Sequence, residues 1–290
     1  MERKKVTVSE LQGKKSRREK ITRITAHDYL TGLLADRVGF DMILVGDSLG
    51  MVALGYENTL PVTMDEMIHH GKAVSRAAKA SFLLGDMPFI SYQTGVQDAI
   101  RNAGRFLKEA GMDGVKMEGG QRVAPIAEAV VGAGIPVSGH IGLTPQSVVK
   151  VSGYLSQGRD AEAARQLLAD AKALESAGCF MISLEAIPAR LAKLITDQLS
   201  IPTMGIGSGP DCDGQSLNFY DVVGLFERFK PKFVKKYANL LPEMEEALKQ
   251  YKLEVESGSF PDAEHCYGIS DEVFGQILEL PEFGGSVVIT

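Results

Sequence analysis

Short apolar runs alternate with longer amphipathic stretches over most of this chain. Short runs are typical of buried strands, and apolar positions three and four residues apart are typical of helices. The runs predict seven strands, at 20–28, 42–47, 81–89, 114–120, 135–143, 179–188 and 201–209, with 231–239 as a candidate eighth. The amphipathic stretches predict helices between these strands, at 29–38, 63–78, 95–111, 121–134, 159–178 and 188–200.

A repeated strand–helix unit builds a parallel sheet with helices outside it. Seven or eight such units in 290 residues fit a (β/α)8 TIM barrel, typically about 250 residues long. A doubly wound open sheet is the alternative, but it usually carries a glycine-rich turn after its first strand, and TAHDYLTG is not one. We therefore predict an α/β protein with an N-terminal arm over 1–19 and one barrel domain over 20–290. The barrel domain would end in a helical extension, with helices at 241–257 and 270–279.

Acidic residues stand at the ends of four predicted strands: Asp47, Asp86, Glu118 and Glu185. In a closed barrel the strand ends meet at one rim, so these side chains would converge on one cavity. Buried like charges repel and are costly to remove from water, so such a cluster favours a bound cation. A single strand-end aspartate often only caps the following helix. Four acids at one rim indicate a metal-dependent enzyme instead.

Asp47 and Asp86 end neighbouring strands and can face the same ion, and Glu118 ends the next strand. Oxygen ligands without clustered cysteine and histidine favour Mg²⁺, Mn²⁺ or Ca²⁺ over Zn²⁺. Mg²⁺ typically takes only one or two carboxylates and leaves positions for substrate oxygens. The sequence therefore predicts a site for a hard metal ion at these three residues.

Other polar residues at the strand ends are candidates for substrate binding and proton transfer. Ser48 can donate its hydroxyl and its backbone N–H to a substrate carboxylate, or it can cap a loop. Lys116 leaves its strand on the same face as Glu118, so it pairs with the carboxylates or binds an anionic substrate. His140 is either a pocket residue or a satisfied core histidine. Glu185 lies across the ring from the first two acids and is placed to act as a general base.

Composition narrows the function classes. The net charge of −6 and pI near 5.5 give no sign of nucleic-acid binding. No apolar run approaches the roughly 20 residues that cross a membrane, and the basic N-terminus lacks the apolar core of a signal peptide. Three widely spaced cysteines form neither a disulfide framework nor a metal-ligand pair. These features predict a cytoplasmic, reducing location.

The motifs taken together resemble the ketopantoate hydroxymethyltransferase (3-methyl-2-oxobutanoate hydroxymethyltransferase) family. The matching stretches, from about residue 20 to 267, are LVGDSLGM, TLPVTMDEMIHH, LLGDMPF, VKMEGG, GHIGLTPQSV, LEAIP, GIGSGPDCDGQ, PKFVKKYAN and SGSFPDAEH. The chain departs from the family after DGQ, where it has Tyr220 and the family usually has histidine. This departure affects only expectations about loop contacts near the end of the barrel.

The resemblance implies a TIM barrel of the phosphoenolpyruvate/pyruvate superfamily, assembled as a homo-oligomer, often a decamer. The implied reaction transfers a hydroxymethyl group from 5,10-methylenetetrahydrofolate to 3-methyl-2-oxobutanoate through a Mg²⁺-stabilised enolate. The product is 2-dehydropantoate, a precursor in pantothenate biosynthesis.

The same resemblance implies a role for each candidate residue. Mg²⁺ would be held by Asp47 and Asp86, and Glu118 would belong to the same metal site. Glu185 would be the proton acceptor. The 2-oxo acid would contact Asp47, Ser48, Asp86, Lys116 and His140. No residue is assigned to folate.

Two alternatives stay open on the sequence. A Mg²⁺-dependent carbon–carbon lyase or phosphonomutase of the same superfamily would share the metal site but need no folate. Such enzymes often carry a catalytic cysteine on a mobile loop, and no cysteine here lies near the strands that end in Asp47, Asp86 and Glu118. A barrel that only binds a metabolite would not need every strand-end acid and Lys116, yet all of them are present.

Overall fold

The computed structural model describes residues 3–147, 156–228 and 231–280. Eight parallel strands pair in chain order and close into a barrel, which confirms the predicted fold. The strands are β1 (Ile21–Thr25), β2 (Met42–Val45), β3 (Phe82–Asp86), β4 (Gly114–Glu118), β5 (Val137–Gly142), β6 (Met181–Glu185), β7 (Thr203–Ile206) and β8 (Gly214–Asn218). All but the last lie within ranges predicted from the sequence.

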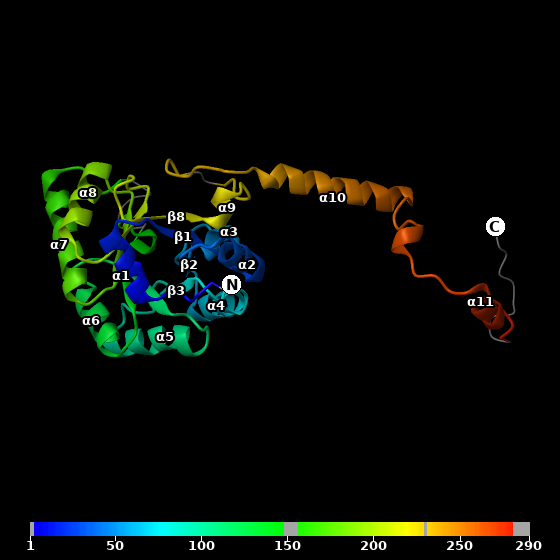
Figure 1. Ribbon diagram of the computed structural model, residues 1–290, viewed down its shortest axis with the longest axis horizontal. Helices are drawn as coiled ribbons and strands as arrows, with labels where there is room; N and C mark the ends of the chain where they lie inside the picture. Colours follow the sequence, from blue (N-terminus) through cyan, green and yellow to red (C-terminus); the bar gives the residue numbers. More distant parts are fainter. Residues whose placement is uncertain (1–2, 148–155, 229–230, 281–290) are drawn as a thin grey trace. The chain divides into compact units, whose positions relative to one another are not determined.

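The long helices of the barrel follow the predicted ranges and form its outer layer (Figure 1). They are α2 (Tyr29–Val38), α4 (Met64–Ala77), α5 (Val96–Lys108), α6 (Ala124–Gly132), α7 (Ala161–Ser176) and α8 (Ala189–Gln198). Local chemistry sets their starts: Thr63 and Glu66 form the predicted capping box of α4, and the Asp28 carboxylate caps α2. Short helices α3 (Leu49–Val52) and α9 (Phe219–Val222) follow β2 and β8.

The prediction of an eighth strand at 231–239 was wrong. The eighth strand is β8, which follows β7 after a short loop without a helix and pairs with β1 to close the barrel. Its sequence, GQSLN, combines a glycine with mostly polar residues that have low β propensity. Pairing with both neighbours holds this segment as a strand. Segment 231–239 forms turns and loop, and Phe233 within it lines the cavity at the barrel rim.

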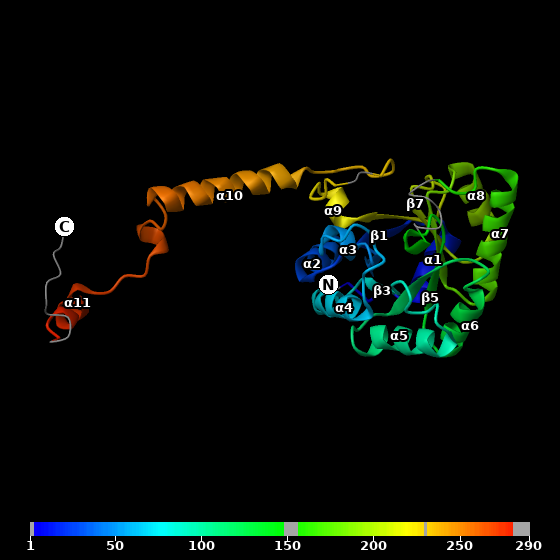
Figure 2. The same ribbon diagram turned by 180° about the vertical axis from the view of Figure 1, so that it is seen from behind.

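Helix α1 (Val8–Arg17) closes the other end of the barrel. Its Leu11 is fully buried and packs in a cluster with barrel residues that include Ile21, Met42 and Met181. Figures 1 and 2 show α1, in dark blue, lying over the strands rather than in the outer ring of helices. The predicted N-terminal arm is therefore helical and contributes to the core of the unit Met1–Ala238.

Residues Asn239–Thr290 form a second compact unit. It contains α10 (Leu240–Ser257) and α11 (Asp271–Leu278), which confirm the two helices predicted after the barrel. A short 3₁₀ turn, Ala263–His265, lies between them. Within the residues that the structure describes, no helix is both long and apolar enough to cross a membrane.

Candidate active site

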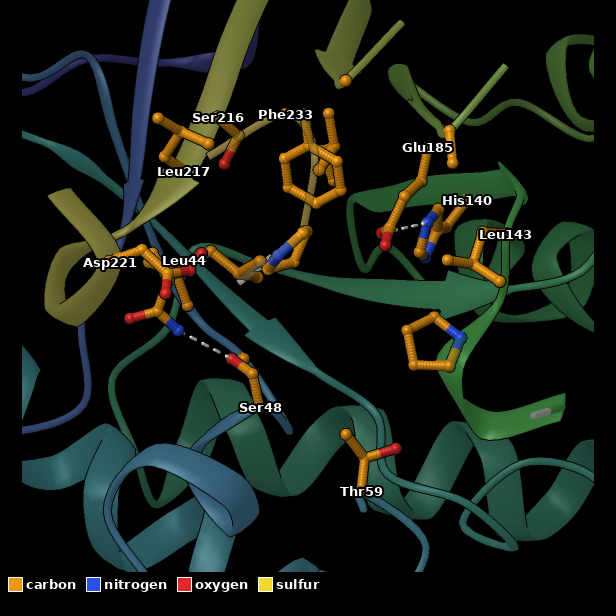
Figure 3. Close-up of a pocket in the computed structure, with 18 of the residues that line it drawn as sticks. Leu44, Ser48, Thr59, His140, Leu143, Glu185, Ser216, Leu217, Asp221 and Phe233 are labelled. Atoms are coloured by element: carbon orange, nitrogen blue, oxygen red, sulfur yellow. Dashed lines mark hydrogen bonds and ion pairs between the residues drawn. The ribbon is translucent and has the colours of Figure 1, made fainter. Parts of the chain in front are cut away.

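A cavity of about 780 Å³ opens at the carboxyl ends of the strands. All seven residues singled out from the sequence line it: Asp47, Ser48, Asp86, Lys116, Glu118, His140 and Glu185. Figure 3 shows the part of this cavity where Glu185 and His140 point toward each other, with Ser48 and Asp221 on the other side. Apolar side chains also line the cavity, among them Phe233 and, beside His140, Leu143.

Strand register explains why charged groups meet at this rim. It pairs Asp86 of β3 with Lys116 of β4, and Glu118 of β4 with His140 of β5. The Lys116 ammonium lies 2.9 Å from Asp86 Oδ1 and 3.7 Å from Glu118 Oε1. Burial disfavours a charged lysine, but the carboxylates of Asp86, Glu118 and Asp47 outweigh it and raise the pKa of Lys116. Lys116 therefore carries a fixed positive charge in the cavity floor.

His140 links two of the acids. Its Nδ1 lies 3.2 Å from Glu118 Oε1, and its Nε2 lies 3.1 Å from Glu185 Oε2. Burial and the Lys116 ammonium disfavour the charged imidazole, yet the two carboxylates outweigh them and raise the pKa of His140. The Glu185 side chain keeps 12% of its surface exposed, against 1% for His140. Glu185 is thus held by His140 on one side and open to the cavity on the other.

Asp47 is the least compensated of the acids. It is 4% exposed, and among the described residues no cationic side chain lies within ion-pair distance of it. Burial, followed by the charges of Asp86 and Glu118, raises its pKa well above the usual range. Its backbone N–H donates to Asp86 Oδ2 at 3.3 Å. This hydrogen bond holds the two residues next to each other in the floor of the cavity.

These residues fit a divalent cation. In the described part of the chain, Asp86 Oδ1 and Glu118 Oε1 are buried and accept no hydrogen bond of good geometry, although Lys116 and His140 lie close. The same part of the chain holds no preformed group of three histidine, cysteine, aspartate or glutamate ligands. The carboxylates of Asp47, Asp86 and Glu118 line one cavity, and a small set of carboxylates matches Mg²⁺, which keeps several waters and leaves positions for substrate oxygens.

Charge balance agrees with that fit. Five carboxylates line the cavity, those of the four strand-end acids and of Asp221, together with the cations Lys116 and Lys232, and Arg23 lies buried within the barrel. Arg23 of β1 is fully buried inside the barrel, where it donates to Ser216 Oγ at 2.9 Å and Ser183 Oγ at 3.1 Å. Burial lowers the pKa of Arg23 to about 10, which still leaves it charged at neutral pH. These five carboxylates outnumber the three cations by two, which is the charge that one divalent cation would neutralise.

Sequence reasoning missed three residues that organise the site: Arg23, Gln146 and Asn218. Gln146 lies in a 3₁₀ turn after β5 (Pro145–Ser147) and is 5% exposed. Its side-chain amide donates to Asp47 Oδ2 at 3.0 Å and to the Met87 carbonyl at 2.9 Å, and its backbone N–H donates to Glu118 Oε2 at 3.1 Å. The only signal was its place in GHIGLTPQSV, directly after a strand.

Comparison with known sequences gives one consistent family. The family model for ketopantoate hydroxymethyltransferase matches residues 5–263. The 3-methyl-2-oxobutanoate hydroxymethyltransferase of Moorella thermoacetica is 58% identical over 266 residues, which covers 92% of this chain and 99% of that protein. The enzyme of the same name from Syntrophomonas wolfei is 54% identical over 273 residues, covering 94% and 99%.

Solved structures agree on the fold at low sequence identity. A phosphoenolpyruvate phosphomutase from Streptomyces platensis superposes with a TM-score of 0.58 at 14% identity and covers 96% of each chain. A 2,3-dimethylmalate lyase of the PEP mutase/isocitrate lyase superfamily gives 0.57 at 13% identity and covers 95% of each. These likenesses support the barrel fold. The extent of the sequence matches, over nearly the whole chain, shows that it belongs to the ketopantoate hydroxymethyltransferase family.

Proposed function

We propose that this protein uses Mg²⁺ to transfer a hydroxymethyl group from 5,10-methylenetetrahydrofolate to 3-methyl-2-oxobutanoate. With one water consumed, the products are 2-dehydropantoate and tetrahydrofolate. The observation that carries this proposal is the pair of buried acids Asp47 and Asp86 beside the buried cation Lys116. A hard metal and a fixed positive charge side by side are what a 2-oxo acid, with its keto oxygen and carboxylate, requires.

Asp47 and Asp86 would hold the metal ion directly, and Glu118 through a water molecule. Bound Mg²⁺ would supply Lewis-acid polarisation of the keto oxygen, which makes the neighbouring C3–H more acidic. Lys116 and Ser48 would bind and orient the acid from two sides of the cavity. Both residues line the cavity, and Lys116 cannot lose its charge at neutral pH because three carboxylates surround it.

Glu185 would take the proton from C3. It is the carboxylate farthest along the ring from Asp47 and Asp86, and it is the most exposed of the four. His140 contacts its Oε2 at 3.1 Å and so orients the carboxylate. The carbon that loses its proton would then attack the one-carbon unit of the folate. A cavity of about 780 Å³ falls in the range of sites for drug-sized ligands, so it has room for more than a five-carbon acid.

The test is formation of 2-dehydropantoate from the two substrates, with Mg²⁺ and after chelation. Product that disappears on chelation supports the whole proposal. Mg²⁺-dependent exchange of the C3 proton without product would keep the metal site and Glu185 but reject folate as the one-carbon donor. If neither signal appears, the proposed reaction is wrong.

Two further features belong to the same proposal. We expect a homo-oligomer, a decamer by analogy with the family, and a cytoplasmic location. Sedimentation velocity of the purified full chain measures the first, and fractionation of cells that make the protein measures the second.

A further inference from the structure

The ends of three strands meet around one hydroxyl group. Ser48 follows β2, His27 follows β1, and Asn218 ends β8. Asn218 Nδ2 donates to Ser48 Oγ at 3.2 Å, and His27 Nε2 lies 3.3 Å from the same oxygen. The pairing of β1 with β8 places Asn218 opposite Thr25, two residues before His27. Neither Asn218 nor His27 is one of the acidic residues at the strand ends.

The amide of Asn218 is oriented by its second contact. Asn218 Oδ1 accepts from the backbone N–H of Tyr220 at 3.0 Å and so caps α9. An amide whose oxygen faces the helix must turn its nitrogen the other way, toward Ser48. Tyr220 in turn donates through its hydroxyl to Asp28 Oδ2 at 3.2 Å, which fastens α9 to the start of α2. Asn218 therefore acts as a hydrogen-bond donor to Ser48.

His27 is a second hydrogen-bond donor to Ser48. It is fully buried, and burial followed by the neighbouring His70 lowers its pKa to about 3, so the ring is neutral. In the described part of the chain His27 Nδ1 has no hydrogen-bond partner. A buried N–H without an acceptor is rarer in proteins than an unused acceptor position. The ring proton is thus favoured on Nε2, where it is donated to Ser48 Oγ.

A hydroxyl oxygen has two lone pairs and one proton. With Asn218 and His27 both donating to it, Ser48 can only offer its proton, and the open direction is the cavity that it lines. We propose that His27 and Asn218 are positioning residues that fix the Ser48 hydroxyl as a donor into the cavity, so that the site selects a ligand group that only accepts hydrogen bonds. If the proposed function is right, that group is the carboxylate of the 2-oxo acid.

The test uses Asn218→Ser, because serine is also a good helix cap but is too short to reach Ser48. We expect a dissociation constant for 3-methyl-2-oxobutanoate, measured with saturating Mg²⁺, that is about 5- to 10-fold higher, and a KM raised by a similar factor. The kcat should change by less than about threefold, because the bound acid still meets the metal and Glu185. His27→Phe, which keeps a ring but loses its donor, should act in the same way. Exposed Asn239→Ser is the matched control and should change neither constant.

A double-mutant cycle separates this role from general loosening of the fold. In a Ser48→Ala background the donors have no hydroxyl to orient, so Asn218→Ser should then change the dissociation constant by less than about twofold. An equal loss in both backgrounds would overturn the inference. So would an unchanged dissociation constant for both Asn218→Ser and His27→Phe in the otherwise wild-type protein.

The same measurements distinguish this inference from the proposed function. If the wild-type protein binds the 2-oxo acid but forms no 2-dehydropantoate, the proposed reaction fails and the cycle on binding still decides the role of His27 and Asn218. If the wild-type protein does not bind the acid at all in the presence of Mg²⁺, both are overturned.

Discussion

Gln146 donates its side-chain amide to the Asp47 carboxylate at 3.0 Å, across 99 residues of sequence. The same residue donates its backbone N–H to Glu118 Oε2 and accepts from the Tyr92 hydroxyl at 2.9 Å. A turn after β5 therefore holds two acids from β2 and β4 in place. Ligand-orienting contacts of this kind tune metal affinity without touching the metal.

We expect Gln146→Leu to weaken Mg²⁺ binding by about 10- to 100-fold, the range typical for loss of a residue that orients a ligand. Leucine has a similar volume, so the main change is the loss of the side-chain hydrogen bonds to Asp47, the Met87 carbonyl and the Tyr92 hydroxyl. Isothermal titration calorimetry with Mg²⁺ measures the effect. Gln250→Leu, on the exposed surface of α10, is the control. An unchanged Mg²⁺ dissociation constant in Gln146→Leu would show that Asp47 does not depend on this contact.

Substitutions of Asp47 and Asp86 should have opposite effects on the metal-free fold. Asp47 has no cationic partner within ion-pair distance among the described residues, and burial together with Asp86 and Glu118 raises its pKa. Asp47→Asn removes a buried negative charge and should raise the metal-free Tm by about 2–5 °C. Asp86→Asn leaves the Lys116 ammonium without its partner at 2.9 Å and should lower the Tm.

We expect Mg²⁺ to raise the Tm of the wild-type protein and both variants to lose that increase. Scanning calorimetry of the wild-type protein and both variants, with Mg²⁺ and with a chelator, measures these Tm values. A metal-free Tm that falls in both variants would contradict the electrostatic account of Asp47. A normal response to Mg²⁺ in either variant would remove that residue from the metal site.

Glu185→Gln should separate binding from proton transfer. Glutamine keeps the shape and can still accept from His140, so the dissociation constant of the 2-oxo acid should stay within about threefold. Turnover should fall by about 10² to 10⁴, the usual contribution of a general base. Proton NMR in D₂O follows exchange of the C3 proton directly. Glu128→Gln on the exposed face of α6 is the control, and near-normal exchange in Glu185→Gln would assign the base elsewhere.

The sequence predicted the barrel because its strands and helices have distinct hydrophobic periods. Buried runs such as MILV and FLLG are apolar on both faces. This is expected for strands that are covered by helices on the outside of the barrel and packed against other side chains in its interior. Acids at the ends of these runs mark the rim, so Asp47, Asp86, Glu118 and Glu185 were found without any structure. That prediction needs only chain order and the rule that parallel strands end on one side.

Features that depend on distant partners were not predictable in this way. Strand β8 has few β-forming residues and is held by its ladders to β1 and β7. Arg23 belongs to the predicted strand at 20–28, but the sequence gives no sign that its side chain lies inside the barrel, where hydroxyls of β6 and β8 hold it. Gln146 and Asn218 act through side-chain amides that donate to Asp47 and Ser48, residues far away in the sequence.

Asp221 gives a prediction about pH. It lies on α9 at the cavity wall, and burial, opposed by Lys236, raises its pKa to about 6. Below the unfolded-state pKa of about 4, both states are protonated and Asp221 costs nothing. As the pH rises from 4 through 6, the folded state holds its proton longer, so the carboxyl makes the fold progressively less stable relative to an uncharged side chain.

Asp221→Asn should therefore be more stable than the wild-type protein at pH 7, and the difference should shrink toward pH 4. Because the side chain is partly exposed, solvent screening limits the gain at pH 7 to about 1–2 kcal/mol, or a Tm higher by roughly 2–5 °C. Thermal unfolding of the metal-free protein at half-unit steps from pH 4 to pH 7 measures it. The exposed Asp211→Asn serves as control. A difference between Asp221→Asn and wild type that is constant over this range would mean that the Asp221 carboxyl ionises in the fold as it does in water.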